Sequence, residues 1–285
     1  MSGRRCLALL LVLALPAGLG AQERVSFRAL PAPGQTIRIG MTTVVVSDMQ
    51  GIPTGPLKME VRTVFQGTEK VGDLDAEGRL SVEIVYDSVN AAITMNGTPM
   101  GNPGAGSEFA GQTLKAVFDG QGKLVDVKVP ESMANIESAV RTMLATLAGT
   151  MPKVPMAVGD TAVVLLNIPV PLQLPGSAPG QPMLMDTRNV FKLTGITRDG
   201  SDQIAQLAQT TEATLTTTLD LSAMTGSALS ADVELKMTGT GTTEVNVDKG
   251  FIRTLNLDSL MDMTMRIQGM TIKLVGNSKT TITGK

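Results

Sequence analysis

The sequence predicts a mainly β protein: a large antiparallel half-barrel or sandwich made of two tandem β repeats, with one amphipathic helix at 131–148 between them. Three observations predict this fold class. Apolar and polar residues alternate through most of the chain, turns rich in Asp and Gly separate the alternating runs, and one segment changes to a helical spacing. Alternation with a period of two is typical of antiparallel strands that have one face on a core and one in water.

The alternation is clearest over residues 57–65, 80–87, 213–221 and 232–237. In the last of these, Val233 and Leu235 lie on one side of the predicted strand while Asp232 and Glu234 lie on the other. A twisted antiparallel sheet of about ten or more strands curls or splits into two layers, so both the half-barrel and the sandwich stay open.

Predicted hairpin tips stand between these runs, at Asp75–Gly78, Asp119–Gly122, Asp199-Gly200 and Asp248–Gly250. Asp and Gly tolerate the positive φ angles that tight turns require. The sequence Asn96-Gly97-Thr98 matches a glycosylation acceptor as well as a hairpin turn, and we favour the turn.

A helix is predicted from Glu131 to Leu147, where apolar residues recur at helical spacing. Pro130 is suited to opening this helix and Gly149 to closing it. The apolar positions are Met133, Ile136, Val140, Met143, Leu144 and Leu147. We expect this apolar side to pack on the sheet.

The two halves of the chain resemble each other. Gly34-Gln-Thr36 recurs as Gly159-Asp-Thr161, and Arg62-Thr-Val-Phe65 as Arg188-Asn-Val-Phe191, with Gly111 matching Gly241 and Asp119 matching Asp248 in the same order. Strand meanders look alike in general, but alternation alone does not preserve the order of such anchors. The predicted organisation is a leader (1–21), a first β repeat (22–130), a linking helix (131–150) and a second β repeat (151–285).

The N-terminus has the layout of a secretory signal peptide. Arg4 and Arg5 precede an apolar run from Cys6 to Leu15, which is too short for a permanent membrane anchor. Cleavage is expected near Gly20 or Ala21, and the mature protein is expected in the periplasm or outside the cell. A buried N-terminal helix or an uncleaved anchor is the less favoured alternative. Because Cys6 is the only cysteine, the mature chain forms no disulfide.

The composition argues against an enzyme and against a nucleic-acid-binding protein. Histidine and tryptophan are absent, there is one tyrosine, and no Ser-x-x-Lys or phosphate-binding Gly-Lys-Ser/Thr motif occurs. Loss of two arginines with the leader changes the formal charge from −2 to −4 (−2 − 2). A chain with this charge is not expected to have the positively charged surface that binds nucleic acid. We predict no enzymatic activity and no cofactor, although carboxylates that pair only in space would allow a hydrolase.

Two motifs have a metal-binding alternative. Met261, Met263 and Met265 alternate, so a strand places their thioethers on one face, where they suit copper(I) or, by our preference, an apolar lining. The acidic run Asp73–Gly78 resembles the start of a calcium loop, but Ile84 stands where that loop needs a bidentate Glu. We favour a hairpin tip, and no metal site is predicted.

Two loops are predicted as well. Gly97–Gly111 is rich in glycine, and Asn167–Met183 interleaves prolines with Val170, Leu172 and Leu174. Such dense prolines exclude a central strand and favour an extended path. The second loop is interpreted as lying over the core, with a lid or docking surface as the alternative.

With these features, the chain resembles uncharacterised secreted β-repeat proteins of bacteria that carry a step like Val158-Gly-Asp-Thr161 at mid-chain. More distantly, its expected architecture is similar to that of periplasmic lipoprotein-carrier half-barrels, which hold acyl chains on an open antiparallel sheet. This second resemblance implies a fold, and fold analogy alone does not establish function.

The favoured function is that of an exported, non-enzymatic envelope protein that binds an apolar ligand on a concave β face. The partner is a lipid or a lipidated protein, with peripheral membrane contact allowed, no nucleic acid, and the oligomeric state open. The candidate ligand-binding residues are Met261, Met263, Met265, Val170, Leu172 and Leu174. The alternative is a structural or protein-interaction module of the envelope with a filled core.

Overall fold

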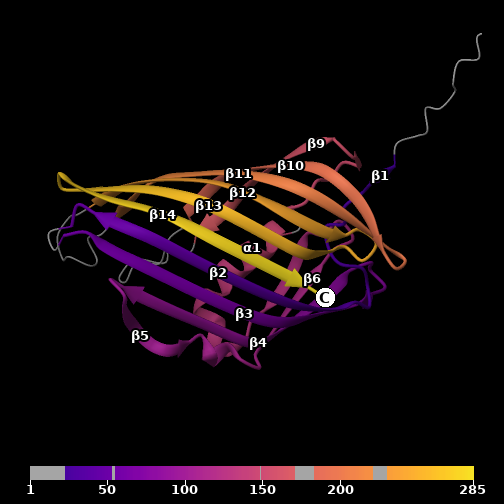
Figure 1. Ribbon diagram of the computed structural model, residues 1–285. Coiled ribbons are helices and arrows are strands. Elements are labelled where there is room, and N and C mark those ends of the chain that lie inside the picture. Colours follow the sequence, from indigo (N-terminus) through magenta and orange to yellow (C-terminus); the bar gives the residue numbers. More distant parts are fainter. Residues whose placement is uncertain (1–22, 53–54, 148, 171–182, 221–229) are drawn as a thin grey trace, which may run out of the picture.

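The computed structural model describes residues 23–52, 55–147, 149–170, 183–220 and 230–285. They form a 12-stranded antiparallel sheet, a separate 2-stranded sheet and one α-helix (Figure 1). The predicted class, mainly β with a large antiparallel sheet and one helix, is confirmed. The leader predicted at 1–21 lies outside the described residues.

The strands are β1 (Arg24–Val25), β2 (Thr36–Gln50), β3 (Leu57–Leu74), β4 (Leu80–Met95), β5 (Thr98–Ala105), β6 (Thr113–Phe118), β7 (Leu124–Lys128), β8 (Met156–Ala157), β9 (Thr161–Val170), β10 (Met183–Asp199), β11 (Asp202–Asp220), β12 (Ser230–Asn246), β13 (Phe251–Ile267) and β14 (Met270–Gly284). The helices are the 3₁₀ helices η1 (Ser107–Phe109) and η2 (Glu131–Ile136) and the α-helix α1 (Glu137–Leu147). The four alternating segments of the sequence fall in β3, β4, β11 and β12, with 213–220 described for the third.

The large sheet has the strand order β7-β6-β4-β3-β2-β14-β13-β12-β11-β10-β9, and β5 pairs with β4 beside this path. Each half of the chain is a meander, and the two meanders join where β2 pairs with β14. The small sheet pairs β1 with β8, each of which shortly precedes the first long strand of its half. The outer strands of the long sheet are β7 and β9.

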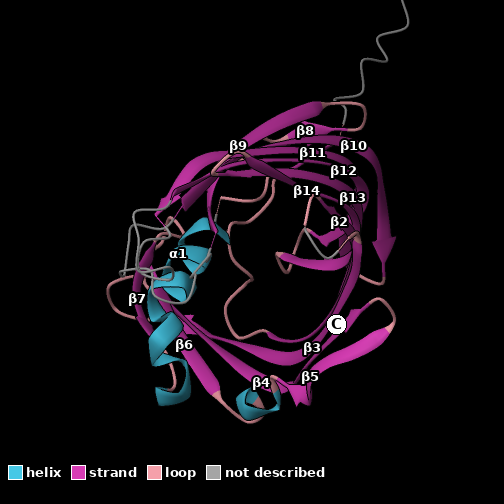
Figure 2. Ribbon diagram, turned by 90° about the vertical axis from the view of Figure 1, so that its left-hand side faces the viewer, coloured by secondary structure: helices cyan, strands magenta, loops and turns pink. Residues whose placement is uncertain are grey.

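The sheet is strongly curled rather than flat. Figure 2 shows the strands arranged around a central space, with α1 between the two outer strands, and α1 contacts both β7 and β9. Glycines permit a close backbone approach between neighbouring strands: a Cβ at Gly241 would lie 2.2 Å from the carbonyl oxygen of Asn256, and one at Gly276 would lie 2.8 Å from that of Val46. The helix therefore spans the gap that the sheet leaves open.

The helix predicted at 131–148 is present, with its first part in 3₁₀ form from Glu131 and its second part as α1. Val140 and Leu144 are buried, whereas Met143 is 49 % exposed. The apolar side expected to pack on the sheet does so through these two buried residues.

The predicted hairpin tips are all present, and two of them have the same internal bonding. Asp75 Oδ1 accepts hydrogen bonds from the backbone N–H groups two and four residues ahead, at 3.0 and 2.8 Å. Asp119 Oδ1 accepts the equivalent pair, both at 2.9 Å. Gly78 and Gly122, at the same place in each turn, have φ angles of 73° and 79°. Side-chain bonding and positive φ together explain why Asp and Gly mark these turns.

The first anchor of the predicted duplication recurs in the hydrogen bonding. Gly34 N–H donates to the carbonyl of Val71 at 3.0 Å, and Gly159 N–H donates to that of Leu193 at 2.7 Å. The same two acceptor residues donate in return: Val71 N–H donates to the carbonyl of Gln35 at 2.8 Å, and Leu193 N–H donates to that of Asp160 at 3.0 Å. Both glycines have positive φ angles. The division of the chain into two repeats stays a prediction.

Both predicted loop segments contain regular structure that the sequence did not predict. The segment Gly97–Gly111 contains the strand β5 and the helix η1, and Asn167 to Val170 complete β9. Pro169 is tolerated because β9 is an outer strand, paired on one side with β10. Residues 167–170, predicted as loop, are therefore strand, and Met183 begins β10; residues 171–182 of the predicted loop lie outside the described residues.

The buried core forms two clusters at one end of the sheet, which we call the capped end; it carries the β3–β4, β6–β7, β10–β11 and β12–β13 hairpins. One cluster lies under the β1–β8 pair and includes Val25, Met156, Leu193 and Leu207. The other includes Val140 and Leu144 of α1 with Val82, Leu114 and Val127 of the sheet. The opposite end, with the β4–β5 and β13–β14 hairpins, is called the far end.

Candidate ligand-binding face

The two faces of the sheet differ sharply in chemistry. Along β12, Ala231 and Val233 on the concave face are buried, while Asp232 and Glu234 on the convex face are exposed. Opposed residues on neighbouring antiparallel strands share a face, so the strand pairing identifies the concave side chains across the whole sheet. The convex face carries ion pairs such as Arg266–Glu234 at 2.8 Å.

The three predicted methionines lie together on the concave face. Met261, Met263 and Met265 on β13 are each half-buried. In the pairing with β12 they face Met237, Leu235 and Val233, and in the pairing with β14 they face Gly276, Leu274 and Ile272. The structure thus joins them into a broad apolar field in the half of the concave face nearest the far end.

Other residues of this field were not singled out in the sequence. Met49, Met59, Met95 and Met237 lie on the same face and are half-buried. Their signal was the alternation of their strands, but the sequence does not reveal which strands become neighbours. The other three candidate ligand-binding residues come from the predicted proline-rich loop. Val170 ends β9 opposite Met183, and Leu172 and Leu174 lie outside the described residues. That these three residues take part in ligand binding stays a prediction.

The apolar field has no helical cover within the described ranges. The β1–β8 pair and α1 both pack into the two clusters at the capped end. Towards the far end, Leu215, Val233 and Leu274 are buried, but the larger side chains around them keep part of their surface accessible. Large apolar side chains left partly accessible on a concave face are a common feature of ligand-binding sites.

A band of uncharged polar side chains crosses the concave face between the apolar field and the capped end. We call it the polar belt. Its members are Asn189, Gln209, Thr211, Thr243, Ser259, Ser278, Thr280, Thr43 and Thr63. Thr43 and Thr280 lie opposite each other on β2 and β14 with their hydroxyl oxygens 3.2 Å apart.

Four members of the polar belt form a directed hydrogen-bond chain. Thr243 Oγ1 donates to Gln209 Oε1 at 3.3 Å, and Gln209 Nε2 donates to Thr211 Oγ1 at 3.1 Å. Thr211 Oγ1 then donates to Asn189 Oδ1 at 2.7 Å. The chain runs across β12, β11 and β10 and ends on an amide.

One buried hydroxyl borders the belt without a partner. Ser47 is 1 % exposed, and its Oγ has no hydrogen-bond partner. It lies on the concave face opposite Gly276 on β14 and Met59 on β3. Leaving a buried hydroxyl unpaired commonly costs about 1–3 kcal/mol. The hydroxyl of Ser47 can therefore still form a hydrogen bond.

The capped half of the concave face holds one isolated carboxyl. Glu69 on β3 lies between Ile37 and Ile84 in the pairing, and burial raises the pKa of its carboxyl above the usual value. Nearby, the rings of Phe65 and Tyr86 meet edge to face with centroids 5.5 Å apart. Burial also raises the pKa of the Tyr86 phenol.

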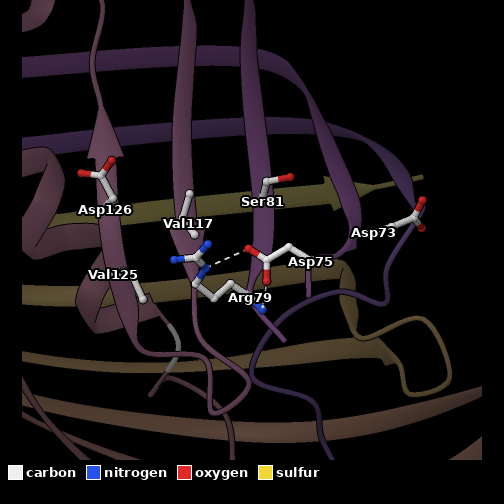
Figure 3. A pocket seen from close by; sticks show the side chains of 7 residues that line it. All are labelled: Asp73, Asp75, Arg79, Ser81, Val117, Val125 and Asp126. Atoms are coloured by element: carbon white, nitrogen blue, oxygen red, sulfur yellow. Dashed lines mark hydrogen bonds and ion pairs between the residues drawn. The ribbon is translucent and has the colours of Figure 1, made fainter. Parts of the chain in front are cut away.

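A pocket of about 240 Å³ lies between the β3–β4 and β6–β7 hairpins, and its lining is shown in Figure 3. Its basic group is already engaged: Arg79 Nε donates to Asp75 Oδ2 at 2.8 Å, and Arg79 Nη2 donates to Glu77 at 2.9 Å. Hydrogen bonds from the backbone and side chain of Arg79 lower the pKa of the Asp75 carboxyl. Both Asp75 oxygens serve the turn, so the acidic run 73–78 is a self-bonded hairpin tip.

Within the described ranges, no group of three or more acidic or cysteine side chains is arranged to hold a metal ion. A search of the same residues for a helix of sufficient length and apolar character to span a membrane gives none.

No family model and no curated protein matches this sequence. Among solved structures, lipovitellin, described for its lipid–protein interactions, is similar at 10 % identity over 90 % of this chain, with a TM-score of 0.49; this chain spans about a quarter (25 %) of that one. The β domain of the Bordetella autotransporter BrkA is similar at 8 % identity over 85 % of this chain and 98 % of that one, with a TM-score of 0.25. Pseudomonas aeruginosa OccK7 is similar at 7 % identity over 88 % and 99 %, with a TM-score of 0.24.

Proposed function

We propose that this protein is an exported, non-enzymatic envelope protein whose concave face binds an apolar ligand, either a lipid or the lipid of a lipidated partner. The observation that carries the proposal is the apolar field. Its methionines and leucines face inward on a curled sheet, keep accessible surface, and have no helix over them among the described residues. Covering such surface with hydrocarbon is favourable by roughly 25 cal/mol per Å².

Methionine suits this role because its side chain is unbranched and flexible. A face rich in methionine adapts to guests of irregular or variable shape, as lipid chains are. The paired positions of Met261 and Met237, and of Met59 and Met95, place such side chains on both flanks of the β2–β14 junction. A ligand held there contacts adaptable side chains from several strands.

The remaining features support a binding role in the envelope. The leader-like segment 1–21 supports export, and the absence of histidine removes the commonest general base. The polar belt consists of hydroxyl and amide groups, which bind and orient a ligand without an ionisable group to move a proton. Binding, rather than catalysis, is the chemistry that these groups favour.

The test is lipid uptake by the full mature protein. Protein purified from its host envelope is examined by native mass spectrometry, and delipidated protein is titrated with a fluorescent fatty acid. Wild type is expected to carry or take up lipid, and Met263→Lys to lose uptake because it places a charge in the apolar field. Leu260→Lys is the matched control, since Leu260 lies on the same strand but on the convex face, 66 % exposed. A wild-type protein that carries no lipid and takes up none contradicts the proposal.

The alternative is a structural or interaction module with a filled core, and the burial of Leu215, Val233 and Leu274 in the apolar field favours it. In that case the accessible methionines complete a solid core, and wild type takes up no lipid. Met263→Lys then lowers the free energy of unfolding, with no binding to lose.

A further inference from the structure

The polar belt suggests which part of an amphiphile the concave face recognises, and this inference rests on the proposed lipid-binding function. The directed chain from Thr243 through Gln209 and Thr211 ends at the amide oxygen of Asn189. Each donor in the chain points the same way. Hydrogen bonds in such a chain polarise one another, so the N–H groups of Asn189 become better donors.

The amide nitrogen of Asn189 is free to donate. The side chain is 7 % exposed, its Oδ1 is occupied by Thr211, and Nδ2 has no hydrogen-bond partner among the described residues. Asn189 lies on the concave face, opposite Thr211 on one side and Val164 on the other. Among the described residues Ser47 Oγ is the fully buried side-chain atom without a partner, so Asn189 Nδ2 keeps accessible surface, where water or a ligand carbonyl can accept its N–H groups.

The surroundings favour an acceptor without charge. The basic side chains of the neighbouring strands, such as Arg188 and Lys236, lie on the convex face, one residue out of phase with Asn189 and Met237. An anion at Asn189 would be buried without a compensating cation, which is strongly unfavourable. An ester or amide carbonyl accepts the same hydrogen bond with no charge to bury.

Asn189 lies next to the apolar field. Ser47, with its free hydroxyl, and Met261 lie one step nearer the far end, in the row of paired residues next to that of Asn189. From Asn189 to Met183, β10 extends about 20 Å further along the apolar field. A hydrocarbon chain whose carbonyl sits at Asn189 reaches Met261 by crossing β11 and β12 towards the far end.

We propose that the concave face selects amphiphiles with an uncharged ester or amide carbonyl, which Asn189 receives at the end of the Thr243–Gln209–Thr211 chain while the hydrocarbon tail covers Met261 and its neighbours. This names the ligand class as neutral acyl esters or amides. It distinguishes them from free fatty acids, alkyl ammonium ions and plain hydrocarbons of the same length.

The experiment displaces a bound fluorescent fatty acid from the full mature protein with dodecane, methyl laurate, laurate and dodecylammonium. Methyl laurate is expected to bind about three- to tenfold more tightly than dodecane, as one net hydrogen bond provides. Asn189→Leu is expected to remove this preference, so that methyl laurate no longer binds more tightly than dodecane. Asn277→Leu, an exposed change on the convex face of β14, is expected to preserve it.

Each outcome decides the inference. Equal binding of methyl laurate and dodecane, preference for either ion, or an ester preference that survives Asn189→Leu overturns it while the proposed lipid binding stands. If neither the fluorescent fatty acid nor any of the four probes binds by calorimetry, the proposed function fails as well. Should Asn189→Leu not fold, the wild-type series alone still decides, because the ester preference is a property of the wild type.

Discussion

The hydroxyl of Thr211 donates to the amide oxygen of Asn189 at 2.7 Å, from one strand to the next, and both side chains are more than nine-tenths buried. Strand residues that face a core are usually apolar. Here two adjacent strands place a polar pair at the same level of the concave face, and Gln209 and Thr243 extend it. The pair is therefore part of a connected polar structure inside an otherwise apolar curl.

Thr211→Val is expected to destabilise the protein by about 1–3 kcal/mol, because it leaves Asn189 and Gln209 with unpaired polar atoms in a buried setting. The free energy of unfolding in urea measures this change. Thr214→Val is the control: Thr214 is an exposed residue on the convex face of the same strand, so its replacement is expected to stay within about 0.5 kcal/mol of wild type. Equal effects of the two substitutions would show that the buried chain contributes no stability.

Much of the fold could be predicted because local signals determine it. The alternation around Val233, the turn residues Asp75 and Asp119, and the helical spacing of Val140 and Leu144 each act over a few neighbours. The strand at Thr98–Ala105 was missed because its glycines and prolines are typical of loops. It forms because β4 offers a free edge for it to pair with.

The candidate site was only partly predictable. Met261, Met263 and Met265 could be found because their period of two is local. The chain from Thr243 to Asn189 could not, because its members lie on three strands and meet only through the sheet register. Single threonines and asparagines in strands are common, and nothing in the sequence says which of them face inward together.

Gly241 on β12 lies too close to the backbone of β13 for a side chain to fit without a shift. A Cβ there would lie 2.2 Å from the backbone oxygen of Asn256, and backbone cannot move aside as a flexible side chain can. We expect Gly241→Ala to lower the free energy of unfolding by about 1–3 kcal/mol, measured in urea. In Gly120→Ala the new Cβ meets only an ordinary contact, 3.5 Å from Gly78, so this control is expected to change stability by less than 1 kcal/mol. A neutral Gly241→Ala would mean that β12 and β13 can separate enough to admit a side chain.

The contact between α1 and the sheet is expected to contribute substantially to stability. Leu144 is 3 % exposed and belongs to the cluster with Leu114 and Val127, so Leu144→Ala removes buried methyl groups and leaves a cavity. The expected loss is about 2–5 kcal/mol by thermal or urea unfolding. Met143→Ala, on the outward side of the same helix, is expected to cost well under 1 kcal/mol. A small effect of Leu144→Ala would indicate that the helix docks weakly on the sheet.

Glu69 is expected to make stability depend on pH. Because burial raises its pKa in the folded protein above the usual 4.5, the folded state holds the proton more tightly than the unfolded state does. The contribution of Glu69 to the free energy of unfolding is therefore greatest below pH 4.5. It falls as the pH rises from 4.5 towards the raised pKa, by at most about 1.4 kcal/mol per pH unit, and is constant above that pKa. Glu69→Gln cannot ionise, so the variant should match wild type in acid and exceed its stability at neutral pH.

Urea unfolding at several pH values from acid to neutral measures the Glu69 effect, with Glu60→Gln on the exposed side of β3 as the control. The control should follow the wild-type pH profile, whereas Glu69→Gln should lack the decline that begins near the usual glutamate pKa. Glu69 lies between two isoleucines and has no ion-pair partner among the described residues, so no compensating charge is lost with it. If Glu69→Gln and wild type have parallel profiles across this range, the carboxyl is hydrated in the folded protein and the capped half of the concave face admits water.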